Sequence, residues 1–328
     1  MNELRINLLN YSKPIKGKYY LNWETWRNFL KSSEYKKIES STNLSINFTM
    51  DGFTLINLDG LIWLLLIGDK LHSQERRLFL TLPNDQGQLR YIKGFDFWKL
   101  AKDSFLITNL SSLDSIELRS YTYSMIEKVN NDTLNGRFLD EILISIKGLL
   151  DESLTKAGQG GISNLGQIGL KERDEVYYSA LRELSKNVVE HSSRETKKGW
   201  GYSGIAHSGD KINLCIVDNG IGFLSSLKNK EIIVSNDEMA IEEAFLYGYK
   251  NREKLKGKGI FDVLTLIRKI GGSIMIRSGT GEGNLKIEKG TINPEEIKSL
   301  IENMEPYPLP TNFPGVQYRI LLNPPLEK

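Results

Sequence analysis

The segment at residues 214–222 restricts the possible folds of this chain more than any other. Residues 214–217, Leu-Cys-Ile-Val, form a nearly continuous apolar run, which predicts a strand buried on both faces. The run ends abruptly at Asp218, which Gly220 and Gly222 follow. A carboxylate there can accept a hydrogen bond from an exocyclic amine such as that of adenine, and glycines let backbone approach a flat ring. The segment therefore predicts a ligand site at a strand end, with an ordinary tight turn as the alternative.

A second group of polar residues lies on a helix predicted at residues 174–192. Glu183, Asn187 and His191 follow one another at intervals of four residues and therefore share one face of that helix. An amide oxygen is a neutral ligand suited to magnesium, which keeps several of its waters. A carboxylate one turn earlier can orient or deprotonate one of those waters. A solvated polar helix face is the alternative interpretation of the same spacing.

A third element directly precedes a helix predicted at residues 260–270. Lys256, Gly257, Lys258 and Gly259 combine positive charge with glycines at a helix N-terminus. Backbone N–H groups and the positive end of the helix dipole make such a position suited to an anion. The element predicts phosphate binding, and a solvated basic loop is the alternative.

Composition narrows the class of protein. The 328 residues carry 43 Lys and Arg against 41 Asp and Glu, a net charge of +2, so charge gives no reason to expect a nucleic-acid or membrane partner. The single cysteine, Cys215, excludes an internal disulfide framework. The first residues lack a signal-peptide pattern, and the longest apolar run, Leu61–Gly68, is too short to span a bilayer. We expect a cytoplasmic protein.

The first third of the chain alternates strand-like and helix-like stretches, which indicates a small α/β layer. The polar residues 119–135 are expected to join it to a second domain. Strands are predicted at 44–50, 54–58, 77–82 and 113–118, and helices at 61–72 and 87–104.

The second part is predicted to mix helices with a hairpin and two later strands. A glycine-rich connector is expected at 157–169 and an irregular charged segment at 224–256. Helices are predicted at 138–150 and 294–304, hairpin strands at 203–207 and 211–217, and later strands at 273–278 and 316–322.

In order and spacing, the three polar elements resemble the GHKL ATPase superfamily, which includes DNA gyrase, sensor histidine kinases and MutL. Glu183, Asn187 and His191 match the family's N-box, in the version found in anti-sigma-factor serine kinases. Residues 218–222 match the first glycine box, and residues 256–259 match the second. The likeness covers roughly residues 135–328.

The resemblance implies a Bergerat fold, in which helices cover one face of a largely antiparallel sheet and ATP with Mg²⁺ binds between helices and a lid. By analogy, Asn187 coordinates magnesium, His191 belongs to the nucleotide site, Asp218 reads adenine, and Glu183 is the general base. Residues 256–259 hold the phosphates.

Three features depart from the family pattern. Residues 314–318 resemble the final glycine box, but Val316 replaces the usual threonine. The second box lacks its third glycine, and residues 279–315 form a longer insertion than a minimal kinase-type domain needs. The lid is expected at about 224–258.

The N-terminal third resembles a STAS domain. Residues 57–60 stand where such domains present a phosphorylatable hydroxyl, and none is present there. The expected organisation is therefore a STAS-like α/β scaffold or docking domain at 1–125, followed by a GHKL-like ATP-binding domain at 126–328.

The expected function is an ATP–Mg²⁺-binding switch that hydrolyses ATP slowly and couples nucleotide state to docking of a protein partner or to self-association. A serine/threonine protein kinase of the anti-sigma-factor type is one alternative. A non-catalytic nucleotide-sensing adaptor is the other.

Overall fold

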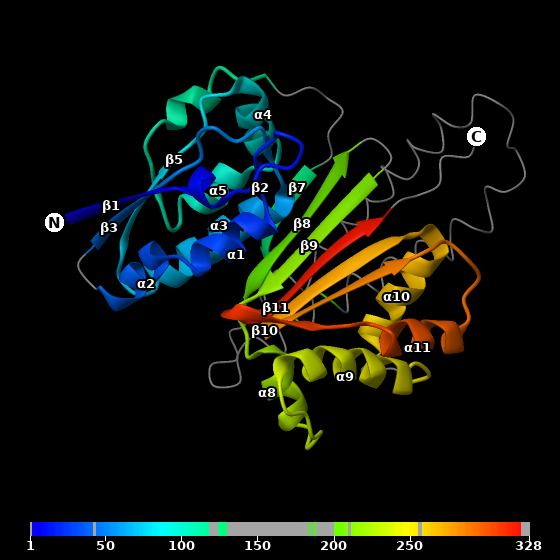
Figure 1. The fold of residues 1–328 in the computed structure, drawn as a ribbon. Helices are drawn as coiled ribbons and strands as arrows, with labels where there is room; N and C mark the ends of the chain where they lie inside the picture. The colour runs from blue at the N-terminus through cyan, green and yellow to red at the C-terminus, as the bar shows by residue number, and fades with distance from the viewer. Residues whose placement is uncertain are drawn as a thin grey trace, which may run out of the picture. The chain divides into compact units, whose positions relative to one another are not determined.

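The computed structural model shows a chain that combines α-helices with β-sheets and divides into two compact units, Met1–Glu127 and Lys128–Lys328 (Figure 1). The domain boundary predicted between residues 125 and 126 lies inside strand β7 (Ser124–Val129). In the part that the structure describes, no helix is long and apolar enough to cross a membrane. The described residues are 2–41, 44–117, 124–129, 184, 187, 200–208, 211–254 and 258–322.

The first unit is built on a parallel sheet with the strand order β1-β3-β5-β6. In β3, Ile46 and Phe48 are buried while Asn47 and Thr49 are partly exposed, which is the period-two pattern of a strand with one face in the core. The strands step across the sheet in one direction, so right-handed connections place the helices on one face. Their bounds are Asn2–Asn7 (β1), Leu44–Thr49 (β3), Arg77–Thr81 (β5) and Leu106–Ile107 (β6).

The central helix of this unit is α3, most of whose residues are buried, and α1 and α5 pack against it. Two short strands, β2 (Tyr20–Leu21) and β4 (Leu55–Ile56), form a separate parallel pair, and β4 comes just before α3 in the sequence. The helices are α1 (Trp23–Leu30), α2 (Ser33–Ser40), α3 (Leu58–His72), α4 (Gln86–Gly94) and α5 (Phe97–Ala101), with 3₁₀ turns at Leu8–Tyr11 and Leu110–Leu113.

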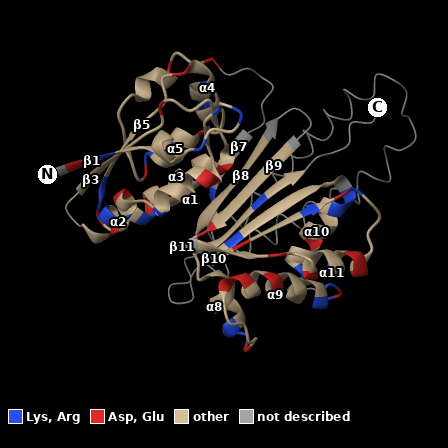
Figure 2. Cartoon of the chain, in the orientation of Figure 1, with Lys and Arg blue, Asp and Glu red and all other residues tan. Residues whose placement is uncertain are grey.

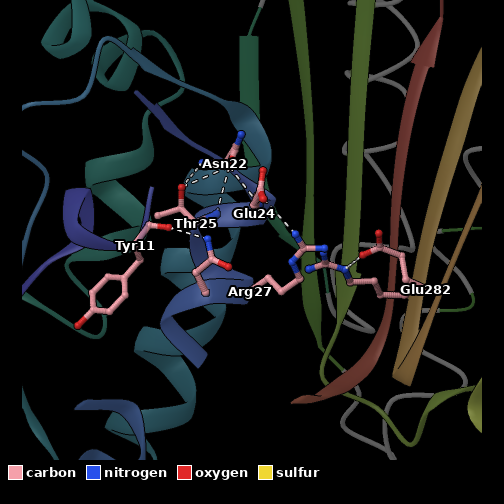
Figure 3. Close-up of polar contacts among 8 residues, drawn as sticks. Tyr11, Asn22, Glu24, Thr25, Arg27 and Glu282 are labelled. Carbon is pink, nitrogen blue, oxygen red and sulfur yellow. Dashed lines mark hydrogen bonds and ion pairs between the residues drawn. The ribbon is translucent and has the colours of Figure 1, made fainter. Parts of the chain in front are cut away.

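Local capping explains where α1 begins. The side chain of Asn22 accepts the N–H groups of Glu24 at 3.0 Å and Thr25 at 3.2 Å (Figure 3). These bonds satisfy N–H groups that have no partner within the helix. Arg27 then pairs with Glu24 at 3.0 Å, one turn further along.

The turn at residues 57–60 lies in the core. Asp59 and Gly60 are buried in the first turn of α3, and Asp59 Oδ2 accepts the N–H of Trp23 at 2.6 Å. A Cβ atom on Gly60 would lie 2.4 Å from the carbonyl oxygen of Leu21. Only Asn57 in this turn is partly exposed, so the turn by itself offers little surface to a partner.

Most predicted elements of the first unit are confirmed, with two corrections. The single helix predicted at 87–104 is wrong, because Asp96 adopts a left-handed conformation (φ 53°) and separates α4 from α5. The strand predicted at 113–118 is also wrong, and the last strand of the sheet is β6. Strands predicted at 44–50, 54–58 and 77–82 and the helix at 61–72 are present as β3, β4, β5 and α3.

The second unit is built on a five-stranded sheet with the order β10-β11-β9-β8-β7. The pairs β10/β11, β11/β9 and β9/β8 are antiparallel, which confirms the predicted hairpin and both later strands. A strand, β7, also occupies part of the stretch predicted to be a polar connection. The other strands are β8 (Gly201–Ser208), β9 (Lys211–Asp218), β10 (Gly272–Ile287) and β11 (Tyr307–Leu322).

Four helices of the described residues, α8 to α11, accompany this sheet, and α9 and α10 pack against each other and against β10 (Figure 1). Acidic residues occupy the first turns of α9 (Asp237, Glu238) and α11 (Glu295, Glu296) (Figure 2). The helices predicted at 260–270 and 294–304 are confirmed. The four are α8 (Gly222–Lys228), α9 (Asp237–Lys250), α10 (Gly259–Ile270) and α11 (Pro294–Glu302).

The irregular character expected for residues 224–256 is wrong. Asn236 caps α9 by accepting the N–H of Met239 at 2.8 Å, and Ile241 and Phe245 are buried one turn apart. The longest described element of the segment expected to form a lid is therefore a helix, α9, which packs on the sheet.

Glycines in β10 allow α9 to approach closely. A Cβ atom on Gly279 would lie 2.3 Å from the Asp237 carboxylate, and one on Gly283 would lie 3.1 Å from Ile241 Cγ2, both on α9. Between them, Thr280 donates its N–H (2.8 Å) and its hydroxyl (2.9 Å) to Asp237. The first part of the predicted 279–315 insertion is thus a strand fitted to α9, while a buried ion pair between Arg277 and Glu282 spans the irregular register beside it (Figure 3).

The close packing of α9 predicts that Gly281→Ala destabilises the protein. The new Cβ would lie 2.9 Å from the backbone carbonyl carbon and oxygen of Asp237, where neither side can easily move. We expect the free energy of unfolding to fall by about 1–3 kcal/mol, measured by chemical denaturation followed by circular dichroism. Gly94→Ala is the matched control, because its Cβ would meet no atom within 4 Å. Equal stability of the two variants would contradict the packing described.

Candidate functional site

Asp218 stands at the end of β9 with only 4% of its surface exposed. Its Oδ1 accepts the N–H of Gly220 at 2.7 Å. A second backbone N–H, that of Val316 on β11, also bonds to the carboxylate. The predicted strand end is thus a buried acid held by two backbone donors from different segments.

Burial raises the pKa of Asp218 to about 7, and the N–H groups of Gly220 and Val316 act in the opposite direction. Tyr318, two residues beyond Val316, is itself buried, which raises its pKa, and the charge of Asp218 raises it further. Asp218 therefore changes charge near neutral pH. A ligand that donates a hydrogen bond to it would favour the charged form.

Glycine is required at position 315 for Asp218 to lie where it does. Gly315 adopts φ +69°, and a Cβ atom there would lie 2.1 Å from the carbonyl oxygen and 2.2 Å from the carboxylate Oδ1 of Asp218. Side chains other than hydrogen are excluded by both the conformation and the contact. The first and final glycine motifs of the sequence, almost a hundred residues apart, therefore meet at one point.

The start of α8 is fixed to β10 by Ser278. Gly222 adopts φ +72°, and its Cβ would lie 2.9 Å from Ser278 Oγ. The next residue, Phe223, donates its N–H to the same Oγ at 2.7 Å. Gly222 was expected to admit a ligand ring, whereas its close neighbour in the structure is the fully buried Ser278.

Asn219, between the acid and the glycines, fastens the turn to the beginning of β8. Its backbone N–H donates to the Trp200 carbonyl at 3.2 Å. In the amide orientation that satisfies both groups, its side chain donates to that carbonyl at 2.8 Å and accepts the indole N–H of Trp200 at 2.7 Å. Both polar atoms of the Asn219 side chain are therefore hydrogen-bonded to Trp200, directly before β8.

The second glycine box is only partly described. Gly259 begins α10 and is buried, and Lys258 Nζ lies 3.5 Å from Asp262 Oδ2, one turn into the helix. The helix has no side-chain cap, so an anion would meet the backbone N–H groups of its first turn. Lys256 and Gly257 lie outside the described residues.

The predicted helix at 174–192 is described only at Leu184 and Asn187. Both are helical, Leu184 is buried and Asn187 is partly exposed, as expected if apolar residues anchor the helix and Asn187 lies on its polar face. Glu183 and His191 lie outside the described residues, as do the helix predicted at 138–150 and the glycine-rich stretch at 157–169. Within the described part, no group of three His, Cys, Asp or Glu residues could hold a metal ion, and the predicted magnesium ligand, Asn187, is none of these types.

Two residues that hold the glycine turn were not identified from the sequence: Trp200, which bonds to Asn219, and Ser278, which bonds to Phe223. Tyr318 belongs to the predicted final glycine box but was given no role there; it packs edge-on against Phe223, with ring centroids 6.3 Å apart. These contacts join distant segments, for which the local sequence carries no signal.

Comparison with known proteins adds no identification. The chain matches no protein-family model, and no curated protein matches it.

The buried carboxylate predicts a pH-dependent effect of Asp218→Asn on stability. The folded pKa of about 7 exceeds the ordinary value of 3.8, so the stability linked to this group is full below 3.8 and is lost as the pH rises through 7. The loss is on the order of 4 kcal/mol at most. The neutral asparagine has no such loss. We therefore expect the melting temperature of the variant, relative to that of the wild type, to increase from pH 5 to pH 8. A difference that is constant over this range would contradict the assignment.

Proposed function

We propose that the second unit binds ATP with magnesium and acts as a slowly hydrolysing switch, in which nucleotide state changes the docking of a protein partner or a second copy of the chain. The observation that carries this proposal is the buried Asp218 at the end of β9. Two backbone N–H groups bond to its carboxylate, and its pKa is about 7.

A carboxylate that reduces stability when charged is better explained by a ligand than by the fold. The amine of adenine would supply the donor that favours the charged form of Asp218. Tyr318 is buried close enough to the carboxylate for the charge of Asp218 to raise its pKa, and it packs against Phe223. Phe223 is partly exposed and would offer apolar surface suited to a flat base.

The architecture of the unit supports the same proposal. The described strand pairs from β8 to β11 are antiparallel, helices pack on β10, and Gly315 of the final glycine box contacts Asp218 of the first. A Bergerat fold accounts for these features together, and a STAS-like first unit would serve as the docking module.

The packing of α9 changes the part assigned to the lid. Since α9 is anchored by Asn236 and by its contact with β10, nucleotide-dependent rearrangement would fall outside this helix. Arg252, Lys254 and Lys258 follow it in the sequence, and their positive charges suit phosphates.

The remaining roles follow the sequence motifs. Asn187 would hold magnesium, which would neutralise phosphate charge, and the backbone of Gly257 and Gly259 would contact the phosphates. Glu183 would accept the proton of the attacking water.

Adenine recognition predicts a preference for ATP over GTP. Guanine presents a carbonyl oxygen where adenine presents an amine, so it would place an acceptor against the Asp218 carboxylate. By calorimetry with magnesium at pH 8, we expect ATP to bind at least about tenfold more tightly than GTP.

Asp218→Asn is the matched control for this preference. An amide can donate to the guanine oxygen, so the variant should lose about 1–3 kcal/mol of ATP affinity and lose the preference over GTP as well. Equal binding of both nucleotides to the wild type would remove the basis for adenine recognition.

Glu183→Gln tests hydrolysis. The amide keeps the shape of the side chain but cannot take a proton, so we expect near-normal ATP binding and a turnover reduced about a hundredfold to ten-thousandfold. With radiolabelled ATP, free phosphate indicates an ATPase, labelled protein indicates a kinase, and unchanged bound ATP indicates an adaptor. Turnover at the wild-type rate would exclude Glu183 as the base.

A further inference from the structure

We propose that Ser278 is a positioning residue for the Asp218 site, because its hydroxyl fixes the start of α8 to β10 and so holds the glycine turn in place against the carboxylate. The inference rests on the proposed nucleotide site for its ligand, but the geometry behind it does not depend on a nucleotide.

The turn from Asp218 to Phe223 is held at both ends. At the first end, Gly220 donates its N–H to the Asp218 carboxylate at 2.7 Å. At the second end, Phe223 donates its N–H to Ser278 Oγ at 2.7 Å. No side chain of the residue preceding α8 caps this helix. Ser278 on β10 instead accepts an N–H of its first turn, as a capping residue would.

Ser278 also belongs to the same cross-strand arrangement as the carboxylate. It pairs directly with Val316 in the β10/β11 register, and residues opposite each other on neighbouring strands share a face. The N–H of Val316 bonds to Asp218, while Gly315 contacts it. Ser278 is therefore one strand away from the residues that confine the carboxylate.

A small side chain is required at this position. Ser278 is fully buried, and its Oγ already lies 2.9 Å from the point where a Cβ of Gly222 would stand. Removing the hydroxyl would leave the Phe223 N–H without its acceptor, and the ring of Phe223 packs against Tyr318 next to Asp218. Loss of this one bond would thus loosen both the turn and the aromatic contact.

The expected result is better access of water to Asp218. Because burial is the largest cause of its raised pKa, access of water would move that pKa from about 7 towards the ordinary 3.8. ATP affinity should then be weaker at pH 8, and the pH below which affinity declines should be lower than in the wild type.

The test compares Ser278→Ala with Ser273→Ala. Ser273 lies on the same strand but on the opposite face and is partly exposed, so it controls for loss of a serine hydroxyl from β10. Calorimetry with ATP and magnesium from pH 5.5 to 8.5 should show, for Ser278→Ala only, about fivefold to tenfold weaker binding at pH 8 and a lower pH midpoint. Unchanged affinity and midpoint in the folded variant would overturn the proposal.

A ligand-free measurement separates this proposal from the proposed function. Melting temperatures of the wild type, Ser278→Ala, Asp218→Asn and the double variant form a cycle, measured at pH 8 and pH 5. We expect a non-additive shift of at least about 2 °C at pH 8 that shrinks at pH 5, where Asp218 is protonated. Additive shifts at both pH values would overturn the positioning role of Ser278 even if ATP binds. Non-additive shifts in a protein that does not bind ATP would instead refute the proposed nucleotide site and support the positioning role.

Ser278→Cys covers the case in which the alanine variant does not fold. The thiol has a similar shape but is a weaker acceptor. The changes in ATP affinity, pH midpoint and melting temperature should therefore be in the same direction as in Ser278→Ala but smaller. A cysteine variant identical to the wild type in the melting cycle would count against the hydrogen bond to Phe223 as the cause.

Discussion

The burial of one carboxylate governs how the strand ends of the second unit are arranged. A charged group removed from water requires donors, and Asp218 receives them from the backbone of Gly220 and Val316. These donors belong to different segments, so β9 and β11 must be neighbours in one particular register. Glycine at 315 follows from the same requirement, because no side chain fits between that backbone and the acid.

The elements predicted correctly are those whose signal is local. The alternation of β3 and the continuous apolar runs of α3 and β9 reflect burial that neighbouring residues share. Helix α9 was missed because its many charged residues obscure the apolar stripe that packs on β10, and because that packing depends on distant glycines. Strand β1 was not predicted although Leu4 and Ile6 alternate with Glu3 and Arg5; the alternation is short, and the partner strand that stabilises it lies about forty positions away.

The candidate site divides in the same way. Asp218 could be found from the sequence because an acid after an apolar run is a local pattern. The position of Ser278 could not, since a serine within a strand is common and only the β9-β11-β10 order brings it near the acid. Tyr318 lies in the predicted final glycine box, but its interaction with the acid depends on the same strand order. The cap that Ser278 provides to α8 crosses 55 positions in sequence, a separation at which capping rules make no prediction.

Trp200 gives the second unit a chromophore of its own. Four of the five tryptophans in the chain, at 23, 26, 63 and 98, belong to the first unit. The indole N–H of Trp200 is bonded to Asn219, the residue immediately after Asp218. A change in that hydrogen bond alters the emission of one identifiable fluorophore, so the state of the turn can be followed optically in the unlabelled protein.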